Sequence, residues 1–263
     1  MKMTALVTGG TGGIGLACAV ELQARGWQVY TLSRRAEGPF QNRHLSADVG
    51  DEAACMAAVG RMAAETGKID LLINCAGFGI SGAAEYTPQA EAEAQLRVNL
   101  LGTANMCRAV IPVMRVQGGG QIVNVSSVAA VAPLPFQAWY SVSKAAVNSY
   151  SMSLHNEVSR FGISVCCVMP GDTATGFTNM RRKTAVGDDV YGGIILRSVA
   201  KMEKDERNGV PAETVAKAVC RAALRKRVRP LYTVGWDYRL LAGLAKILPS
   251  GWKQWILKKM YAE

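Results

Sequence analysis

ALVTGGTGGIG, residues 5–15, decides the fold of this chain. It passes from a short apolar run through a glycine-rich turn into a helical pattern over residues 13–25. Glycines let a backbone approach a ligand closely, and the N-terminus of a helix offers free N–H groups and positive potential to a phosphate. The spacing Gly9-xxx-Gly13-x-Gly15, placed between a strand and a helix, therefore predicts a phosphate-binding turn.

Short apolar runs alternate with helical patterns along the rest of the chain. The strand-like runs are residues 27–33, 69–74, 121–127, 163–170 and 231–235, and the helical patterns cover residues 51–66, 88–116, 137–160 and 211–224. Apolar strands separated by helices indicate buried parallel strands, and right-handed crossovers then build a doubly wound sheet. We therefore predict an α/β fold: one Rossmann-like domain over residues 1–263, with helices on both faces of a parallel sheet.

Composition excludes several classes of protein. The chain has 263 residues, of which 49% are apolar and 19% charged, and this suits one sizeable buried core. Seven scattered cysteines form no CxxC or Cys/His pattern and only two histidines are present, so we expect reduced thiols, no metal site and a cytoplasmic protein. The net charge of +10 is concentrated in the last third, notably in residues 221–229, without any nucleic-acid motif, so we expect no nucleic-acid partner. No apolar run is long enough for a transmembrane segment.

A phenol and an ammonium stand four residues apart in WYSVSKAAV, residues 139–147. Positions i and i+4 share one face of a helix, so Tyr140 and Lys144 are expected to lie one above the other. A lysine close to a phenol favours the phenolate and lowers the pKa of the tyrosine, which makes it suitable for proton transfer near neutral pH.

A set of motifs along the chain resembles those of the short-chain dehydrogenase/reductase family. They are TGGTGGIG at residues 8–15, NCAG at residues 74–77, Asn99, Ser127, the Tyr140-xxx-Lys144 pair and Pro170-Gly171. The resemblance implies that Tyr140 is a general acid/base and that Ser127 donates a hydrogen bond to the substrate oxygen. It also implies that Lys144 binds the nicotinamide ribose and lowers the pKa of Tyr140 together with the oxidised cofactor. By the same resemblance, the backbone carbonyl of Asn99 holds a water in a proton relay.

The end of the second predicted strand indicates which cofactor is used. A dehydrogenase that prefers NAD has Asp or Glu there for the ribose 2′-hydroxyl, whereas this chain has Ser33, Arg34 and Arg35. Because arginine can bind a 2′-phosphate bidentately, we predict NADP(H). The resemblance to NADP-preferring members favours Arg34 as the contact, and a solvated helix start is the alternative to cofactor binding for Arg35. The resemblance completes the set of cofactor-binding residues: Gly9, Thr11, Gly12, Gly13, Ile14, Gly15, Ser33, Arg34, Arg35, Asp48, Val49, Asn74, Ala76, Gly77, Tyr140, Lys144, Pro170, Gly171, Thr173 and Thr175.

Apolar residues near the catalytic motifs predict an apolar substrate. The candidates are Phe78, Val128, Leu134 and Phe177, together with Ser127. The stretches NAGFGISG and SVAAVAPLPFQAWY are similar to hydroxysteroid-type members of the family, which implies a hydroxysteroid substrate and a role in lipid metabolism. Residues 172–209 break the strand–helix alternation after a strand end that faces the ligand crevice, so we predict that they form a substrate lid.

The C-terminal segment, residues 236–263, mixes tryptophans with lysines. This pattern permits an interfacial helix at a membrane surface, but we expect the segment to pack beside the cleft or against another subunit of a homodimer or homotetramer.

Three functions are compatible with these features. We favour an NADP(H)-dependent oxidoreductase that interconverts a ketone and a secondary alcohol on an apolar small molecule. A 3-oxoacyl thioester reductase acting with an acyl carrier protein is the second possibility, since an acidic carrier would suit the basic surface. A non-catalytic NADP-sensing protein is the third, although such a protein would have no reason to keep Ser127, Tyr140 and Lys144 together.

Overall fold

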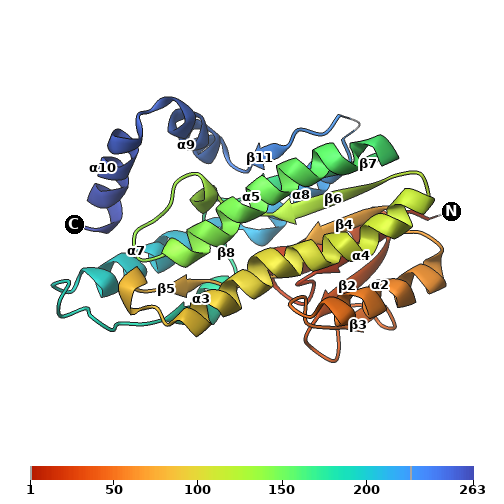
Figure 1. The fold of residues 1–263 in the computed structure, drawn as a ribbon, viewed down its shortest axis with the longest axis horizontal. Helices are drawn as coiled ribbons and strands as arrows, with labels where there is room; N and C mark the ends of the chain where they lie inside the picture. Colours follow the sequence, from red (N-terminus) through yellow and green to blue (C-terminus); the bar gives the residue numbers. More distant parts are fainter. Residues whose placement is uncertain (1, 226) are drawn as a thin grey trace.

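The computed structural model describes residues 2–225 and 227–263, so Lys226 of the basic run lies outside the described residues. A seven-stranded sheet forms the centre of the molecule, with the strand order β11-β7-β6-β4-β1-β2-β3 and parallel pairing throughout (Figure 1). Its strands are β1 (Thr4–Thr8), β2 (Gln28–Ser33), β3 (His44–Ser46), β4 (Leu71–Asn74), β6 (Gly120–Val125), β7 (Ile163–Met169) and β11 (Leu231–Thr233). The predicted doubly wound α/β fold is confirmed.

Helices cover both faces of this sheet. In Figure 1, α4 and α5 lie in front of the strands and α8 lies behind them. The helices around the sheet are α1 (Gly13–Ala24), α2 (Glu52–Thr66), α4 (Gly102–Val116), α5 (Ala138–Val158) and α8 (Ala212–Ala223). The strand order reverses between β1 and β4, and the carboxyl ends of the strands at such a point border the ligand crevice in folds of this type.

The position of β1 inside the sheet explains why its apolar residues form an unbroken run. Successive side chains of a strand point to opposite faces of the sheet. Leu6 packs with the side chains of α2, α4 and α5, whereas Ala5 and Val7 pack with those of α1 and α8. Both faces are therefore buried, and no position of the strand is left for a polar residue facing solvent.

The sequence predicts one regular helix over residues 88–116, but in the structure this range is not one regular helix. It consists of α3 (Gln89–Leu96), a π-helical turn (Arg97–Leu101) and α4. Asn99 lies in the π-helical turn and is buried. Its side chain bonds outside the helix, and an asparagine that does so weakens regular α-helical geometry locally.

The segment from 172 to 209 contains regular elements that the sequence had not indicated. They are β8 (Thr173–Ala174), α6 (Phe177–Met180), β9 (Arg182–Lys183) and α7 (Ile194–Arg207), and β10 (Val210–Pro211) follows directly. β8 pairs with β10, and β9 pairs with β5 (Ile80–Ser81), so two small parallel ladders attach the segment to the rest of the domain. Whether the segment opens and closes as a lid stays a prediction.

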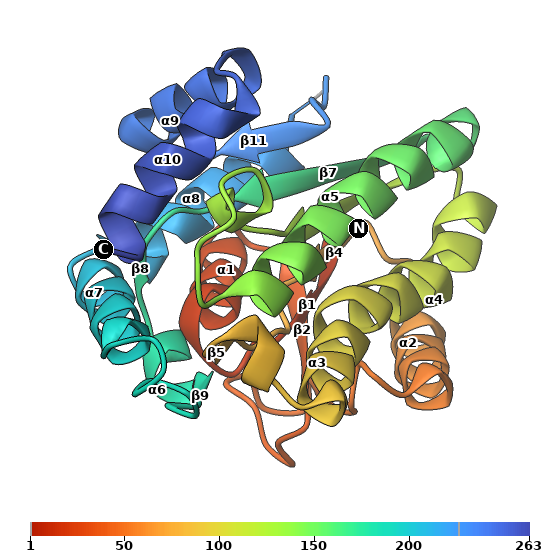
Figure 2. The ribbon, with the colours of Figure 1, turned by 60° about the vertical axis from the view of Figure 1, so that its left-hand side comes forward.

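The C-terminal segment folds into two helices, α9 (Trp236–Ile247) and α10 (Ser250–Tyr261). Figure 2 shows α10 descending towards α7. The hydroxyl of Tyr261 donates to Asp205 on α7 at 3.1 Å, and the two helices are in contact. The segment therefore packs beside the cleft, as one of the sequence alternatives predicted. Trp236 and Ile247 remain exposed, at 80% and 83% of their surface.

The remaining short elements are three 3₁₀ turns, at Ala84–Tyr86, Val128–Ala130 and Ser159–Phe161. Within the described part of the chain, no helix has both the length and the apolar character needed to cross a bilayer.

Candidate functional site

A cleft of about 1210 Å³ opens at the carboxyl edge of the sheet. It is lined by all the residues predicted to bind cofactor or substrate except Asn74, and by three of the four predicted catalytic residues. Six residues of the C-terminal helices also line it, namely Tyr238, Leu241, Ile256, Leu257, Met260 and Tyr261. The C-terminal helices therefore form the cleft together with residues that are far from them in the sequence.

The glycine turn between β1 and α1 forms one wall of this cleft. A Cβ on Gly15 would lie 2.4 Å from the carbonyl oxygen of Gly9, so no side chain fits there. A Cβ on Gly12 would meet no atom within 4 Å, so the backbone is open at that point. α1 begins without a side-chain cap and without an acidic residue in its first turn, which leaves its positive N-terminal end available. This wall fits a phosphate-bearing ligand.

The two arginines after β2 both line the cleft, and both are exposed. The guanidinium of Arg35 donates to the carbonyl oxygen of Thr11 in the glycine turn, at 3.3 Å. The sequence favoured Arg34 as the contact to the 2′-phosphate and also placed Arg35 among the cofactor-binding residues. The structure brings the side chain of Arg35 across to the phosphate-binding turn.

Asn74 does not line the cleft, although it had been predicted to bind the cofactor. It is buried at the end of β4, where its side-chain amide donates to Asn124 on β6 at 2.9 Å. The hydroxyl of Thr8 on β1 donates to its carbonyl group at 3.4 Å. Asn74 therefore joins three adjacent strands and supports the cleft from within the sheet.

Asn99, predicted as catalytic, is also buried beneath the cleft surface. Its side-chain carbonyl accepts from the backbone N–H of Phe78, and its amide donates to the carbonyl of Phe78, both at 3.0 Å. The same amide donates to Ser143 on α5 at 3.0 Å. The side chain thus holds the loop after β4 against the helix that carries Tyr140 and Lys144.

Tyr140 and Ser127 meet in the cleft. Burial raises the pKa of Tyr140 to about 12, and a hydrogen bond with Ser127 opposes this rise. The oxygen of Ser127 also accepts from the backbone N–H of Ala129 at 3.1 Å, so Ser127 caps the 3₁₀ turn that follows. The neighbouring Ser126 points the other way, since its hydroxyl donates to the carbonyl of Lys144 at 3.0 Å.

Lys144 lies on the same side of α5 as Tyr140, with its Nζ 5.8 Å from the centre of the phenol ring. Burial lowers the pKa of Lys144 to about 8, and its ammonium donates to the carbonyl of Val125 at 2.9 Å. The expectation that Lys144 and the oxidised cofactor together lower the pKa of Tyr140 stays a prediction. Burial is the largest cause of the raised pKa of Tyr140, and the ammonium of Lys144 is held by a backbone carbonyl.

Several cleft residues were missed by the sequence analysis. They are the carboxylates Asp172, Asp205 and Glu206, with Lys201 from α7 and Tyr238 from α9. Asp172 directly follows the Pro170-Gly171 motif, and this position was the one available signal. The others come from the 172–209 segment and the C-terminal helices. The sequence pattern did not indicate which side chains of these segments face the cleft.

Comparisons with known proteins show which family and which individual proteins this chain resembles. A family model of short chain dehydrogenases matches residues 3–185. The chain is 39% identical to the 3-ketodihydrosphingosine reductase of Bacteroides thetaiotaomicron, over 98% of this chain and 97% of that protein. It is 31% identical to the NADPH-dependent 1-acyldihydroxyacetone phosphate reductase of Saccharomyces cerevisiae, over 85% of this chain and 79% of that protein. The crystal structure of a short-chain dehydrogenase from Streptomyces avermitilis matches with a TM-score of 0.82 and 26% identity, over 97% and 96% of the two chains.

Proposed function

The chain belongs to the short-chain dehydrogenase family, and we propose that it interconverts a ketone and a secondary alcohol on a long-chain apolar substrate with NADP(H). One observation carries this proposal: Tyr140, bonded to Ser127 and followed by Lys144 on the same helix side, opens into a cleft with apolar walls. The similarity to the reductase from Bacteroides supports a keto group on a lipid as the reacting centre.

The roles of the residues follow from their chemistry. In the reduction, Tyr140 donates its phenolic proton to the carbonyl oxygen, and Ser127 donates a hydrogen bond that positions this oxygen. The bound nicotinamide supplies the hydride for reduction and accepts it in the reverse direction. Lys144 holds the ribose end of the cofactor beside Tyr140, and Asn99 acts as a positioning residue through Phe78 and Ser143.

A raised pKa of Tyr140 suits the reductive direction. A phenol that stays protonated at neutral pH is ready to act as a proton donor, whereas oxidation of an alcohol requires it to act as a base. Two similar proteins are reductases by name, and we infer that this chain also works mainly as a reductase.

Apolar side chains support a long-chain substrate. Phe78, Val128, Leu134 and Phe177 line the cleft as predicted, and Met180, Leu241, Leu257 and Met260 extend the apolar wall. The rings of Phe177 and Tyr140 lie 5.6 Å apart, so Phe177 packs directly beside the proton donor. A hydroxysteroid, which the sequence had suggested, stays a prediction.

We propose that Arg34 and Arg35 together bind the 2′-phosphate of NADP(H). Replacing either by Asp removes a charge-assisted hydrogen bond and adds a repelling carboxylate. Each variant is expected to lower the ratio of kcat/KM for NADPH to that for NADH by about tenfold to a hundredfold. Arg221→Asp is the matched control, because Arg221 is an exposed arginine on α8 outside the cleft. An unchanged ratio in both cleft variants would show that another residue reads the phosphate.

A substrate panel tests the proposed function as a whole. NADPH oxidation is measured with long-chain 3-ketones, ketosteroids and acetoacetyl thioesters at matched concentrations. We expect the long-chain ketones to give the highest kcat/KM. A preference for the thioesters would favour the acyl thioester reductase instead. Tight NADPH binding without turnover of any carbonyl compound would favour a non-catalytic sensor.

A further inference from the structure

We propose that helices α9 and α10 bind the protein to the surface of a membrane that contains anionic lipids. The contact is made by a set of exposed apolar side chains, which we call the docking face: Trp236, Leu240, Leu244, Ile247, Trp252 and Trp255. Binding to the membrane does not depend on the proposed function. Only its consequence for the entry of substrate rests on that function.

α9 presents an apolar stripe to solvent. Trp236, Leu240, Leu244 and Ile247 follow one another at spacings of four, four and three residues, which places them on one side of the helix. All four side chains are exposed, whereas Ala242 on the opposite side is buried against the protein. A surface helix normally turns its apolar stripe towards the core, so the outer stripe of α9 is suited to a second apolar environment.

α10 combines tryptophans with lysines on its outer side. Trp252 and Trp255 are exposed, and their ring centres lie 6.5 Å apart. Lys258 and Lys259 stand about one turn after Trp255, on the same side of the helix. Their side chains remain 66% and 53% exposed, although both pair with Glu263. Tryptophans and lysines together are typical of a helix that lies in the headgroup region of a bilayer.

The exposed apolar side chains of the molecule are concentrated in these two helices. Among the described residues, eight of the twenty large apolar side chains that are exposed belong to α9 and α10, which have 12 residues each. Figures 1 and 2 show α9 and α10 one after the other at one corner of the molecule. Such a concentration indicates an interaction surface, because soluble proteins seldom expose large apolar patches without a partner.

The charge of the segment favours an anionic membrane as this partner. Residues 236–263 contain five basic and two acidic residues, and the whole chain has a net charge of +10. Anionic headgroups attract such a segment while the apolar side chains enter the layer below them. A second copy of the chain fits less well, because it would bring an equal positive charge against the same face.

The docking face lies on the same pair of helices as one wall of the cleft. Leu241 of α9 and Ile256, Leu257 and Met260 of α10 line the cleft. The two helices therefore separate the cleft from the proposed membrane contact. If the substrate is a long-chain ketone, as the proposed function states, it passes from the membrane into the cleft along these helices without crossing bulk water.

Cosedimentation of the full chain with lipid vesicles tests the proposal. We expect the wild-type protein to bind vesicles of phosphatidylcholine and phosphatidylglycerol, with a blue shift of its tryptophan emission, and to bind more weakly as salt is added. Trp236→Gln/Ile247→Gln is expected to lower the partition coefficient by about tenfold or more, because two large apolar side chains no longer leave water.

Val20→Gln/Val116→Gln is the matched control for the loss of apolar side chains. Val20 on α1 and Val116 on α4 are also exposed, at 52% and 89% of their surface, but lie outside the docking face. This variant is expected to keep the partition coefficient of the wild-type protein.

A second pair of variants tests the contribution of charge. Lys258→Gln/Lys259→Gln is expected to weaken binding to the anionic vesicles by about tenfold, with little change on vesicles of phosphatidylcholine alone. Arg61→Gln/Arg108→Gln is its control, because these exposed arginines also pair with glutamates but belong to α2 and α4. It is expected to bind both kinds of vesicle as the wild-type protein does.

The outcomes separate membrane binding from the proposed function. If the wild-type protein does not bind the anionic vesicles, the docking face is wrong and the proposed function is unaffected. If the control variants lose as much binding as the test variants, adsorption is unspecific and the docking face is overturned. If the vesicles are bound as expected but no ketone is reduced, the docking face stands and the proposed function fails.

Sedimentation velocity without vesicles tests the second copy as the partner. We expect Trp236→Gln/Ile247→Gln to have the same oligomeric state as the wild-type protein. If the wild-type protein self-associates and this variant is a monomer, the face joins copies of the chain and membrane docking is overturned. If this variant folds poorly by circular dichroism, the lysine variant and the dependence of wild-type binding on lipid and salt decide the matter.

Discussion

Replacing Tyr140 by Phe is expected to lower kcat for ketone reduction by at least ~10²–10⁴-fold, while NADPH still binds. The phenyl ring keeps the packing of Tyr140 against Phe177, whose ring centre is 5.6 Å away. It has no proton to give to the carbonyl oxygen, and Ser127 remains able only to position that oxygen. Single-turnover kinetics with bound NADPH would measure the loss in the chemical step itself.

Tyr150→Phe provides the control for removing a tyrosine hydroxyl from the same helix. Tyr150 lies on α5 but outside the cleft, and burial raises its pKa as well. We expect this variant to keep a kcat close to that of the wild-type protein. A Tyr140→Phe protein with comparable activity would mean that the proton comes from a different group.

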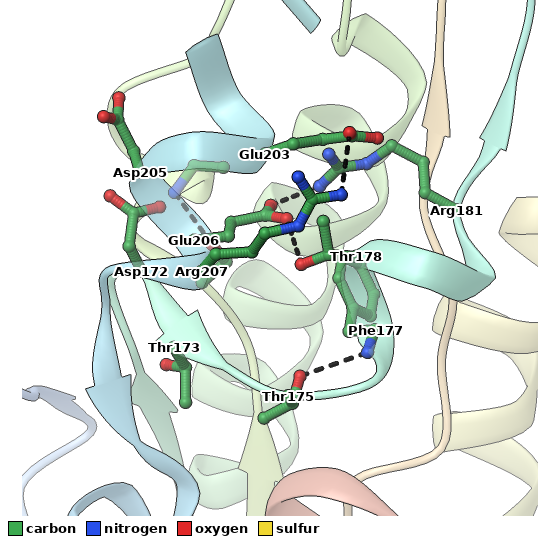
Figure 3. Close-up of polar contacts among 12 residues, drawn as sticks. Asp172, Thr173, Thr175, Phe177, Thr178, Arg181, Glu203, Asp205, Glu206 and Arg207 are labelled. Atoms are coloured by element: carbon green, nitrogen blue, oxygen red, sulfur yellow. Dashed lines mark hydrogen bonds and ion pairs between the residues drawn. The ribbon is translucent and has the colours of Figure 1, made fainter. Parts of the chain in front are cut away.

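Replacing Glu206 by Ala is expected to lower the free energy of unfolding by about 3–5 kcal/mol, because it leaves a buried arginine unpaired. The side chain of Arg181 is 0% exposed and pairs with Glu206, while its Nε and Nη1 have no partner among the described residues. Glu206 also accepts a hydrogen bond of 2.7 Å from Thr178 (Figure 3). Urea unfolding monitored by tryptophan fluorescence would measure the change.

Glu91→Ala is the comparison for an exposed ion pair in the same region. Glu91 pairs with Arg182 at 2.8 Å, and these side chains are 38% and 52% exposed. Its removal is expected to cost less than ~1 kcal/mol. Similar losses in the two variants would show that Arg181 finds other partners or water when Glu206 is absent.

Periodicity alone predicted the central part of the fold. β1 has buried residues on both faces, so its apolar run and the glycine turn after it indicated a buried strand followed by a phosphate-binding turn. The Tyr140 and Lys144 pair could be placed on one helix side because four residues make about one helical turn. Local spacing was sufficient to predict the contacts between residues that are close in the sequence.

The missed features depend on contacts between distant residues. Tyr238 and Asp172 are hydrogen-bonded although they lie 66 positions apart, and no local pattern connects them. Arg35 could not be distinguished from Arg34 by sequence, because the difference lies in which side chain reaches Thr11. The pKa of Tyr140 depends on how deeply the finished fold buries the phenol, which a motif does not specify.

The short ladder between β8 and β10 gives the 172–209 segment a property that its sequence does not reveal. The backbone N–H of Val210 donates to the carbonyl of Asp172 at 3.1 Å, and a Cβ on Gly209 would lie 2.3 Å from the same peptide group. The chain therefore leaves the central domain and returns to it at neighbouring backbone positions, while the ladder between β9 and β5 gives the segment a second attachment. Because the entropy of closing a loop changes slowly with its length, segments of different length can be exchanged there without disturbing the sheet. A graft of residues 173–209 from a relative would therefore measure how much of the substrate preference this segment carries, since Phe78, Val128 and Leu134 line the cleft from outside it.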